Sequence, residues 1–151
     1  MKEALKARTA LAEHRHVPDR LLPVLGDKWI PRDERCLASA RRFVRDVAID
    51  WQTGQDVAEV AELLVSELVT NAITHGSEGA IRISVSRERE LIVVDVHDTC
   101  PTLPCLRLAG RFDVGGRGLA IVQTLSHDWG WTVTRHGKSV WFQLIAWHET
   151  S

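Results

Sequence analysis

The sequence predicts an α+β fold, a two-layer α/β sandwich in which helices cover one face of a mixed, mainly antiparallel sheet. Two long segments, 33–51 and 56–75, repeat apolar residues at helical spacing. Two further segments, 81–96 and 129–145, each contain two β-rich runs around a turn-compatible stretch and predict hairpins. Helices before, between and beside antiparallel strands imply the sandwich.

One domain is the expected organisation. The chain has 151 residues, 44% of them hydrophobic, which is enough to bury a single core without stabilising disulfides or metal ions. Residues 1–20 are rich in Ala, Lys, Glu and Arg and are interpreted as an N-terminal extension, either a weak helix or a mobile segment. Residues 21–151 then form the domain.

The first half of the domain is predicted to contain one strand and two helices. The strand, near 21–30, is placed at a sheet edge because Pro23 lacks the amide that a central strand needs. Asp33 is the expected cap of the first helix. This helix carries an apolar stripe, which a break at 52–54 separates from a helix from about Asp56 to His75; Gly76 is the expected C-terminal cap. The stripe comprises Cys36, Leu37, Ala40, Phe43, Val44, Val47, Ala48 and Trp51.

The second half is predicted to hold two hairpins and a helix. Alternating residues at 81–86 and an apolar run at 91–96 form the first hairpin, which turns at 87–90 and ends near Asp98. Residues 100–116 carry prolines and glycines and are long enough for a lid. A helix follows at about 118–126, and the runs 129–134 and 139–145 form the last hairpin around a turn at 136–138.

Charge and cysteine content exclude several classes of protein. Nineteen basic and 20 acidic residues give a net charge of -1, which provides no broad attraction to nucleic acid or to a membrane surface. Three cysteines, an odd number, without a secretory apolar stretch favour a reducing cytoplasm. The apolar runs are too short to span a bilayer. We therefore expect a cytoplasmic protein without a membrane anchor.

Glu67 and Asn71 are four residues apart in the second predicted helix, so both project from one helix face. Mg²⁺ prefers oxygen ligands and keeps waters while it bridges phosphates, so the Asn71 carbonyl is a sufficient protein ligand. Glu67, one turn away, is placed to orient or deprotonate a hydroxyl that attacks a phosphate. Alternatively, both residues are ordinary members of an exposed helix face.

Two later segments complete the candidate site. Asp98 follows a strand that looks buried, so its carboxylate is expected to face a crevice and accept a hydrogen bond from an adenine amino group; capping of the next turn is the alternative. Asp95 is interpreted as a satisfied sheet residue or a supporting partner. The glycines of 115–119 let backbone amides approach phosphate at a helix N-terminus, and Arg117 adds a direct contact. An ordinary loop-to-helix turn is the alternative reading of this segment.

Known nucleotide fingerprints do not fit the chain. Ile121 stands at the third glycine position of a dinucleotide loop that starts at Gly116. Thr132 stands where a P-loop ending at Gly137-Lys138-Ser139 needs its first glycine.

Three sequence motifs, called boxes below, occur in an order that resembles the GHKL ATPases. Within that family they resemble the small anti-sigma-factor serine kinases of the RsbW and SpoIIAB type. The boxes are ELVTNAITHG at 67–76, DTCPTLP at 98–104 and GRGL at 116–119.

The resemblance covers roughly residues 29–147 and implies a Bergerat-type fold that binds ATP and Mg²⁺ under a lid at 100–115. By motif match it makes Glu67 the catalytic base, Asn71 the Mg²⁺ ligand and Asp98 the adenine reader. His75 matches a position common in the subgroup, although a simple helix-terminal histidine is an equal alternative. Cys100 replaces a glycine of many members, which predicts a tighter adenine pocket or weaker ATP binding. The remaining cofactor-binding positions are Gly116, Arg117, Gly118 and Leu119.

The resemblance also implies a function. It indicates an ATP-dependent protein-serine kinase that phosphorylates an anti-anti-sigma (STAS-type) protein, binds a sigma factor, or does both, and that forms a homodimer. No convincing phosphoacceptor-histidine helix precedes the ATP motifs, which disfavours a conventional histidine kinase. The alternative is a non-catalytic, ATP-responsive binding module. Direct nucleic-acid binding is a third reading that the near-zero net charge disfavours.

Overall fold

The computed structural model describes residues 22–75, 79–98, 116–134 and 137–148. The predicted N-terminal extension at 1–20, the cap at Gly76 and most of the predicted lid lie outside these residues. Cys100 also lies outside them. In the part of the chain that is described, no helix is long and apolar enough to cross a membrane.

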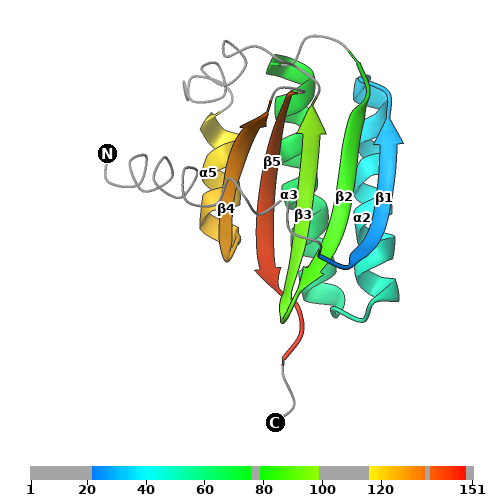
Figure 1. The fold of residues 1–151 in the computed structure, drawn as a ribbon, viewed down its shortest axis with the longest axis vertical. Coiled ribbons are helices and arrows are strands. Elements are labelled where there is room, and N and C mark those ends of the chain that lie inside the picture. Colours follow the sequence, from blue (N-terminus) through cyan, green and yellow to red (C-terminus); the bar gives the residue numbers. More distant parts are fainter. Residues whose placement is uncertain (1–21, 76–78, 99–115, 135–136, 149–151) are drawn as a thin grey trace.

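In the part of the chain that the structure describes, five strands form one sheet with the order β1-β2-β3-β5-β4 (Figure 1). All four neighbouring pairs are antiparallel, so the prediction of a mixed, mainly antiparallel sheet narrows to an antiparallel one in the described residues. β1 lies at an edge, as Pro23 predicted. The strands are β1 (Val24–Ile30), β2 (Ile81–Glu88), β3 (Leu91–Asp98), β4 (Asp128–Thr134) and β5 (Gly137–Ile145).

Among the described residues, three helices cover one face of this sheet (Figure 1). They are α2 (Leu37–Asp50), α3 (Gln55–His75) and α5 (Gly116–Leu125), and a short 3₁₀ turn, η2 (Glu34–Cys36), precedes α2. Asp33 caps this turn, because its Oδ1 accepts a hydrogen bond from the Arg35 amide at 2.9 Å. The two-layer α/β sandwich and its long helices are therefore confirmed, with α5 beginning two residues earlier than predicted.

The core lies between α3 and the central strands. Ile92, Val94 and Val96 of β3 alternate toward the helices and are almost fully buried. Val65 and Val69 of α3 are also fully buried. They are buried because α3 lies between α2 and α5 and packs against both, which widens its apolar face.

The edge strand β1 lies close to α2. A Cβ atom added at Gly26 would come within 2.8 Å of a Val47 methyl and 3.2 Å of the Phe43 ring, so only glycine fits there without movement. The stripe prediction is wrong for Trp51, which is 47% exposed because it lies after the last turn of α2. Trp29 of β1 is also exposed.

Both hairpins form, with tighter turns than predicted. Only Arg89 and Glu90 separate β2 from β3, and Arg89 takes a left-handed φ of 57° to close this turn. The last strand begins at Gly137, so Gly137 and Lys138 are strand residues instead of turn residues. This difference is important for the site, because Lys138 pairs directly with Asp98 across β3 and β5.

Candidate nucleotide site

The predicted site positions gather at one end of the molecule. β3 ends at Asp98, α3 ends at His75, β5 begins at Gly137 and α5 begins at Gly116. These four ends lie together at the upper edge of the sheet (Figure 1). The described residues of the three sequence boxes, which are separated along the chain, therefore lie toward one end of the fold.

Asn71 supplies an unused oxygen at this end. The residue is 8% exposed, and its Oδ1 atom has no hydrogen-bond partner in the described structure. A buried polar atom without a partner costs about 1–3 kcal/mol, so such atoms commonly mark a ligand position. Glu67, one turn earlier on α3, is half-buried. The helix thus presents a carboxylate and an amide on the same side, as predicted.

Asp98 is 1% exposed and forms an ion pair with Arg32, whose Nη2 donates to Oδ1 of the carboxylate. The other guanidinium nitrogen, Nη1, donates to the carbonyl of Ala72 in the last turn of α3. That carbonyl is one of those left without a helical partner at a helix end. Arg32 thus joins the ends of α3 and β3. This role was not predictable from the sequence, because one arginine in a linker does not reveal a partner 66 residues away.

Lys138 adds a second cation beside Asp98. It lies opposite Asp98 in the β3–β5 ladder and is 3% exposed. Burial lowers the pKa of Lys138 and the nearby Arg32 charge lowers it further, whereas the Asp98 carboxylate acts in the opposite direction. One carboxylate thus lies between two cations in a buried position. This cluster has an excess of positive charge.

For His75 and residues 116–119, the position of the backbone shows where they lie in the fold. His75 is the last residue of α3. The first turn of α5 directs backbone amides toward the same end of the fold, as a phosphate-binding helix N-terminus requires. This turn consists of Gly116, Arg117, Gly118 and Leu119.

The opposite face of the sheet carries a second polar cluster. Ser139 Oγ lies 3.1 Å from His97 Nδ1 and also hydrogen-bonds to Asp95. Burial raises the pKa of Asp95 to about 6. Asp95 faces away from Asp98, since the two are an odd number of residues apart on one strand, so it is not a direct partner of Asp98.

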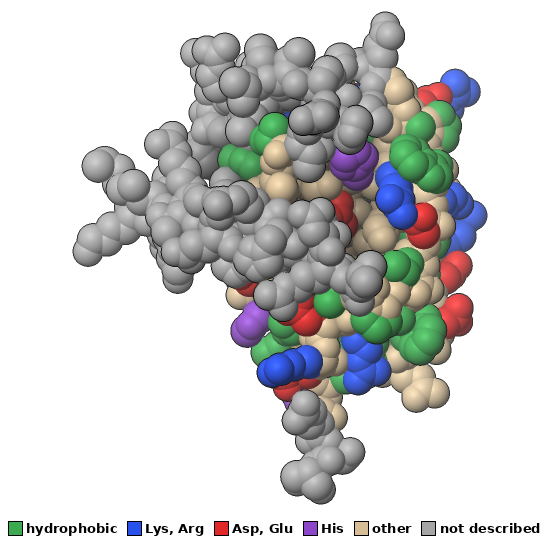
Figure 2. All heavy atoms as spheres, in the orientation of Figure 1, with side chains coloured by type: hydrophobic (Ala, Val, Ile, Leu, Met, Phe, Trp, Pro, Cys, Tyr) green, Lys and Arg blue, Asp and Glu red, His purple; other side chains and the backbone are tan. Residues whose placement is uncertain are grey.

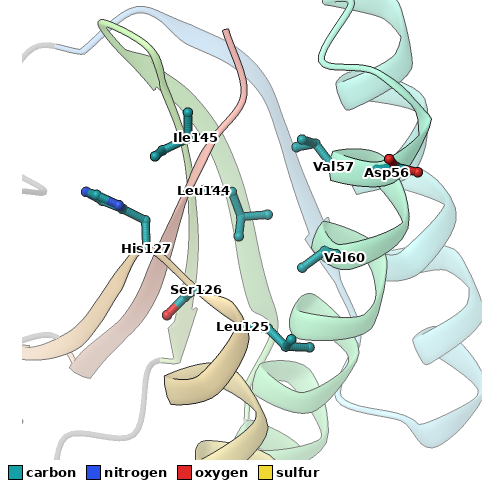
Figure 3. A pocket seen from close by; sticks show the side chains of 8 residues that line it. All are labelled: Asp56, Val57, Val60, Leu125, Ser126, His127, Leu144 and Ile145. Atoms are coloured by element: carbon teal, nitrogen blue, oxygen red, sulfur yellow. The ribbon is translucent and has the colours of Figure 1, made fainter. Parts of the chain in front are cut away.

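A cavity of about 330 Å³ lies at the far end of the helices, between the start of α3 and the ends of α5 and β5 (Figure 3). Apolar side chains form most of its wall, and none of the predicted site residues lines it. The lining residues are Asp56, Val57, Val60, Leu125, Ser126, His127, Leu144 and Ile145.

The charge pattern of the visible surface is mixed. Along β1 and β2, basic and acidic side chains are interspersed (Figure 2). Arg82 and Asp27 pair there through two hydrogen bonds of 2.8 and 2.9 Å. This part of the face therefore lacks the one-sign patch that nucleic-acid binding requires.

Comparisons with known proteins give one matching family and a solved structure of similar fold. The model of a protein family described as "Histidine kinase-like ATPase domain" matches residues 30–144 of this chain. A histidine kinase domain from the blue-light-activated histidine kinase of Erythrobacter litoralis EL346 is similar in structure, with a TM-score of 0.49 and 21% identity. The match covers 78% of this chain and 62% of that one, so the chain spans less than two thirds of its length. No curated protein matches the sequence.

The family match over residues 30–144 defines an ATPase-type domain. The chain belongs to the histidine kinase-like ATPase domain family, whose fold is the Bergerat type and whose members bind ATP with Mg²⁺. The Asn71 oxygen fits this group, because Mg²⁺ accepts a single amide oxygen together with waters and phosphates. Among the described residues, no cluster of three acidic, histidine or cysteine side chains provides another metal site.

Proposed function

We propose that the chain is an ATP-dependent protein-serine kinase that phosphorylates an anti-anti-sigma protein of the STAS type. The observation that carries the proposal is the buried, unpartnered Oδ1 of Asn71, one turn from the half-buried Glu67. Asn71 would hold Mg²⁺, and the first turn of α5 would bind the phosphates. Bound ATP supplies the phosphoryl group.

The chain's own catalytic contribution is proton transfer and positioning. The acceptor serine Oγ bonds to the γ-phosphorus while the bond from that phosphorus to the β,γ-bridging oxygen breaks. Glu67 takes the serine proton, and ADP leaves with the electron pair of the broken bond. No histidine acceptor is needed, because the phosphate goes to a separate protein.

Transfer of label from γ-labelled ATP to a purified STAS-type acceptor tests the proposal. Glu67→Ala should reduce labelling at least about 100-fold and leave Mg·ATP binding intact. Glu62→Ala is the matched control, because Glu62 is an acid of the same helix that pairs at 3.8 Å with Arg45. Equal labelling by wild type and Glu67→Ala would show that Glu67 is not the catalytic base.

A second candidate is a non-catalytic module whose ATP occupancy controls binding to a sigma factor or to a second copy of the chain. The Arg32–Asp98 ion pair favours this non-catalytic module, because Asp98, the residue expected to recognise adenine, already has a charged partner. Calorimetry with Mg·ATP separates the two candidates. Tight nucleotide binding without labelling of any STAS-type acceptor supports the module.

A further inference from the structure

Arg32 holds the Asp98 carboxylate through a charge-assisted hydrogen bond. Its side chain is 11% exposed, and the carboxylate is 1% exposed. Because the same guanidinium also donates to the Ala72 carbonyl, it is fixed at two points instead of one. A side chain fixed in this way is a preorganised part of the site.

This pair competes with the recognition of an adenine base. The exocyclic amino group of adenine is a neutral donor, and hydrogen bonds between two charged groups are roughly twice as strong as neutral ones. An amino group that approaches Asp98 Oδ1 therefore meets an acceptor already bound to a stronger donor. Lys138 pairs with Asp98 across β3 and β5, and its charge interacts with the same carboxylate.

We propose that Arg32 is a specificity-determining residue of the nucleotide site: its hydrogen bond to Asp98 Oδ1 competes with a 6-amino donor at that oxygen and weakens the selection for a 6-amino purine. The inference rests on the proposed ATP site and on Asp98 as its base reader. The phosphates and Mg²⁺ then supply most of the affinity. The wild-type protein accepts triphosphates with and without the amino group almost equally.

Two nucleotides test this inference. Calorimetric titration, with Mg²⁺ present, compares ATP with purine riboside triphosphate, which lacks only the 6-amino group. The wild-type protein should bind the two within about threefold of each other, less than the discrimination expected from one hydrogen bond to a charged group. Arg32→Ala should bind ATP roughly ten- to 100-fold more tightly than the analogue, because Asp98 then accepts from the amino group.

Arg35→Ala is the matched control. Arg35 lies in the same segment, is 91% exposed and pairs with Asp33 through a 3.2 Å contact, so its loss removes the same charge without touching Asp98. Its nucleotide ratio should equal that of the wild type. Arg32→Met keeps the apolar stem and provides a second variant if Arg32→Ala unfolds.

Each outcome decides the matter. A wild-type preference for ATP of tenfold or more shows that Arg32 does not engage Asp98 during binding, and it overturns the inference without any variant. Unchanged ratios in a folded Arg32 variant also overturn it, while the ATP site stands. Failure of every protein to bind either triphosphate overturns the proposed function and the inference together.

Discussion

Asp95 and Asp98 lie on the same strand, but the sheet gives them opposite surroundings. Asp98 faces the helices between Arg32 and Lys138, which are two cations for one carboxylate. Asp95 faces the other side, where Ser139 is its hydrogen-bond donor and Arg82 acts only at a distance. Two identical side chains thus become an ion-paired member of the candidate site and a carboxyl whose pKa is raised to about 6. The alternation of strand faces produces this difference.

The largest expected effect is on the helix-facing side. Asp98→Asn leaves Arg32 and Lys138 without their shared anion, so the free energy of unfolding should fall by roughly 3–5 kcal/mol. Urea denaturation followed by tryptophan fluorescence measures the change.

The exposed Arg82–Asp27 pair is the control for this prediction. Its side chains are 44% and 35% exposed, so Asp27→Asn should cost less than about 1 kcal/mol. Equal losses for Asp98→Asn and Asp27→Asn would contradict the contrast between a buried cluster and a surface pair.

The opposite face predicts a pH dependence. Burial raises the pKa of Asp95 from 3.8 to about 6, against the Ser139 hydrogen bond and the Arg82 charge. The folded state then holds a proton that the unfolded state has released, so stability falls as pH rises through this interval. The loss should be about 3 kcal/mol at most. Urea unfolding of wild type and Asp95→Asn, from about pH 4 to about pH 7, measures it.

Only the difference between the two proteins isolates Asp95, because the other titratable groups are common to both. The variant should be less sensitive to pH and more stable than wild type near neutral pH. If wild type and Asp95→Asn have parallel pH profiles, Asp95 titrates at its ordinary pKa and the comparison fails.

The smallest effect concerns Ser139. Its hydroxyl stabilises the charged form of Asp95, so Ser139→Ala should raise the pKa of Asp95 further and cost about 1 kcal/mol at neutral pH. NMR titration of the Asp95 carboxyl follows the pKa directly. A lower pKa in the variant would show that the hydroxyl does not donate to this carboxylate.

The order of helices and strands was predictable, because amphipathic spacing and turn residues act over a few positions. The edge position of β1 also followed from one residue, Pro23. The candidate site was predictable as far as its motifs reach: Glu67 and Asn71 share a helix, and that helix ends near Asp98. Their chemical roles remain predictions.

The partners of Asp98 were not predictable. Arg32 contacts Asp98 although the two residues are 66 positions apart in the sequence. Lys138 was assigned to a turn because Gly137 precedes it, whereas it is a strand residue. Both depend on strand register, which one sequence does not specify. Burial of Val65 and exposure of Trp51 likewise depend on neighbouring elements instead of local spacing.

The central claim is that the end of the sheet near Asn71 binds Mg·ATP, and calorimetric titration with and without Mg²⁺ tests it most directly. Wild type should bind ATP more tightly with Mg²⁺. Asn71→Ala should lose at least about tenfold in affinity together with most of the Mg²⁺ dependence, because the metal loses its protein oxygen. Absence of binding by wild type, or an unchanged Mg²⁺ dependence in Asn71→Ala, would contradict the claim.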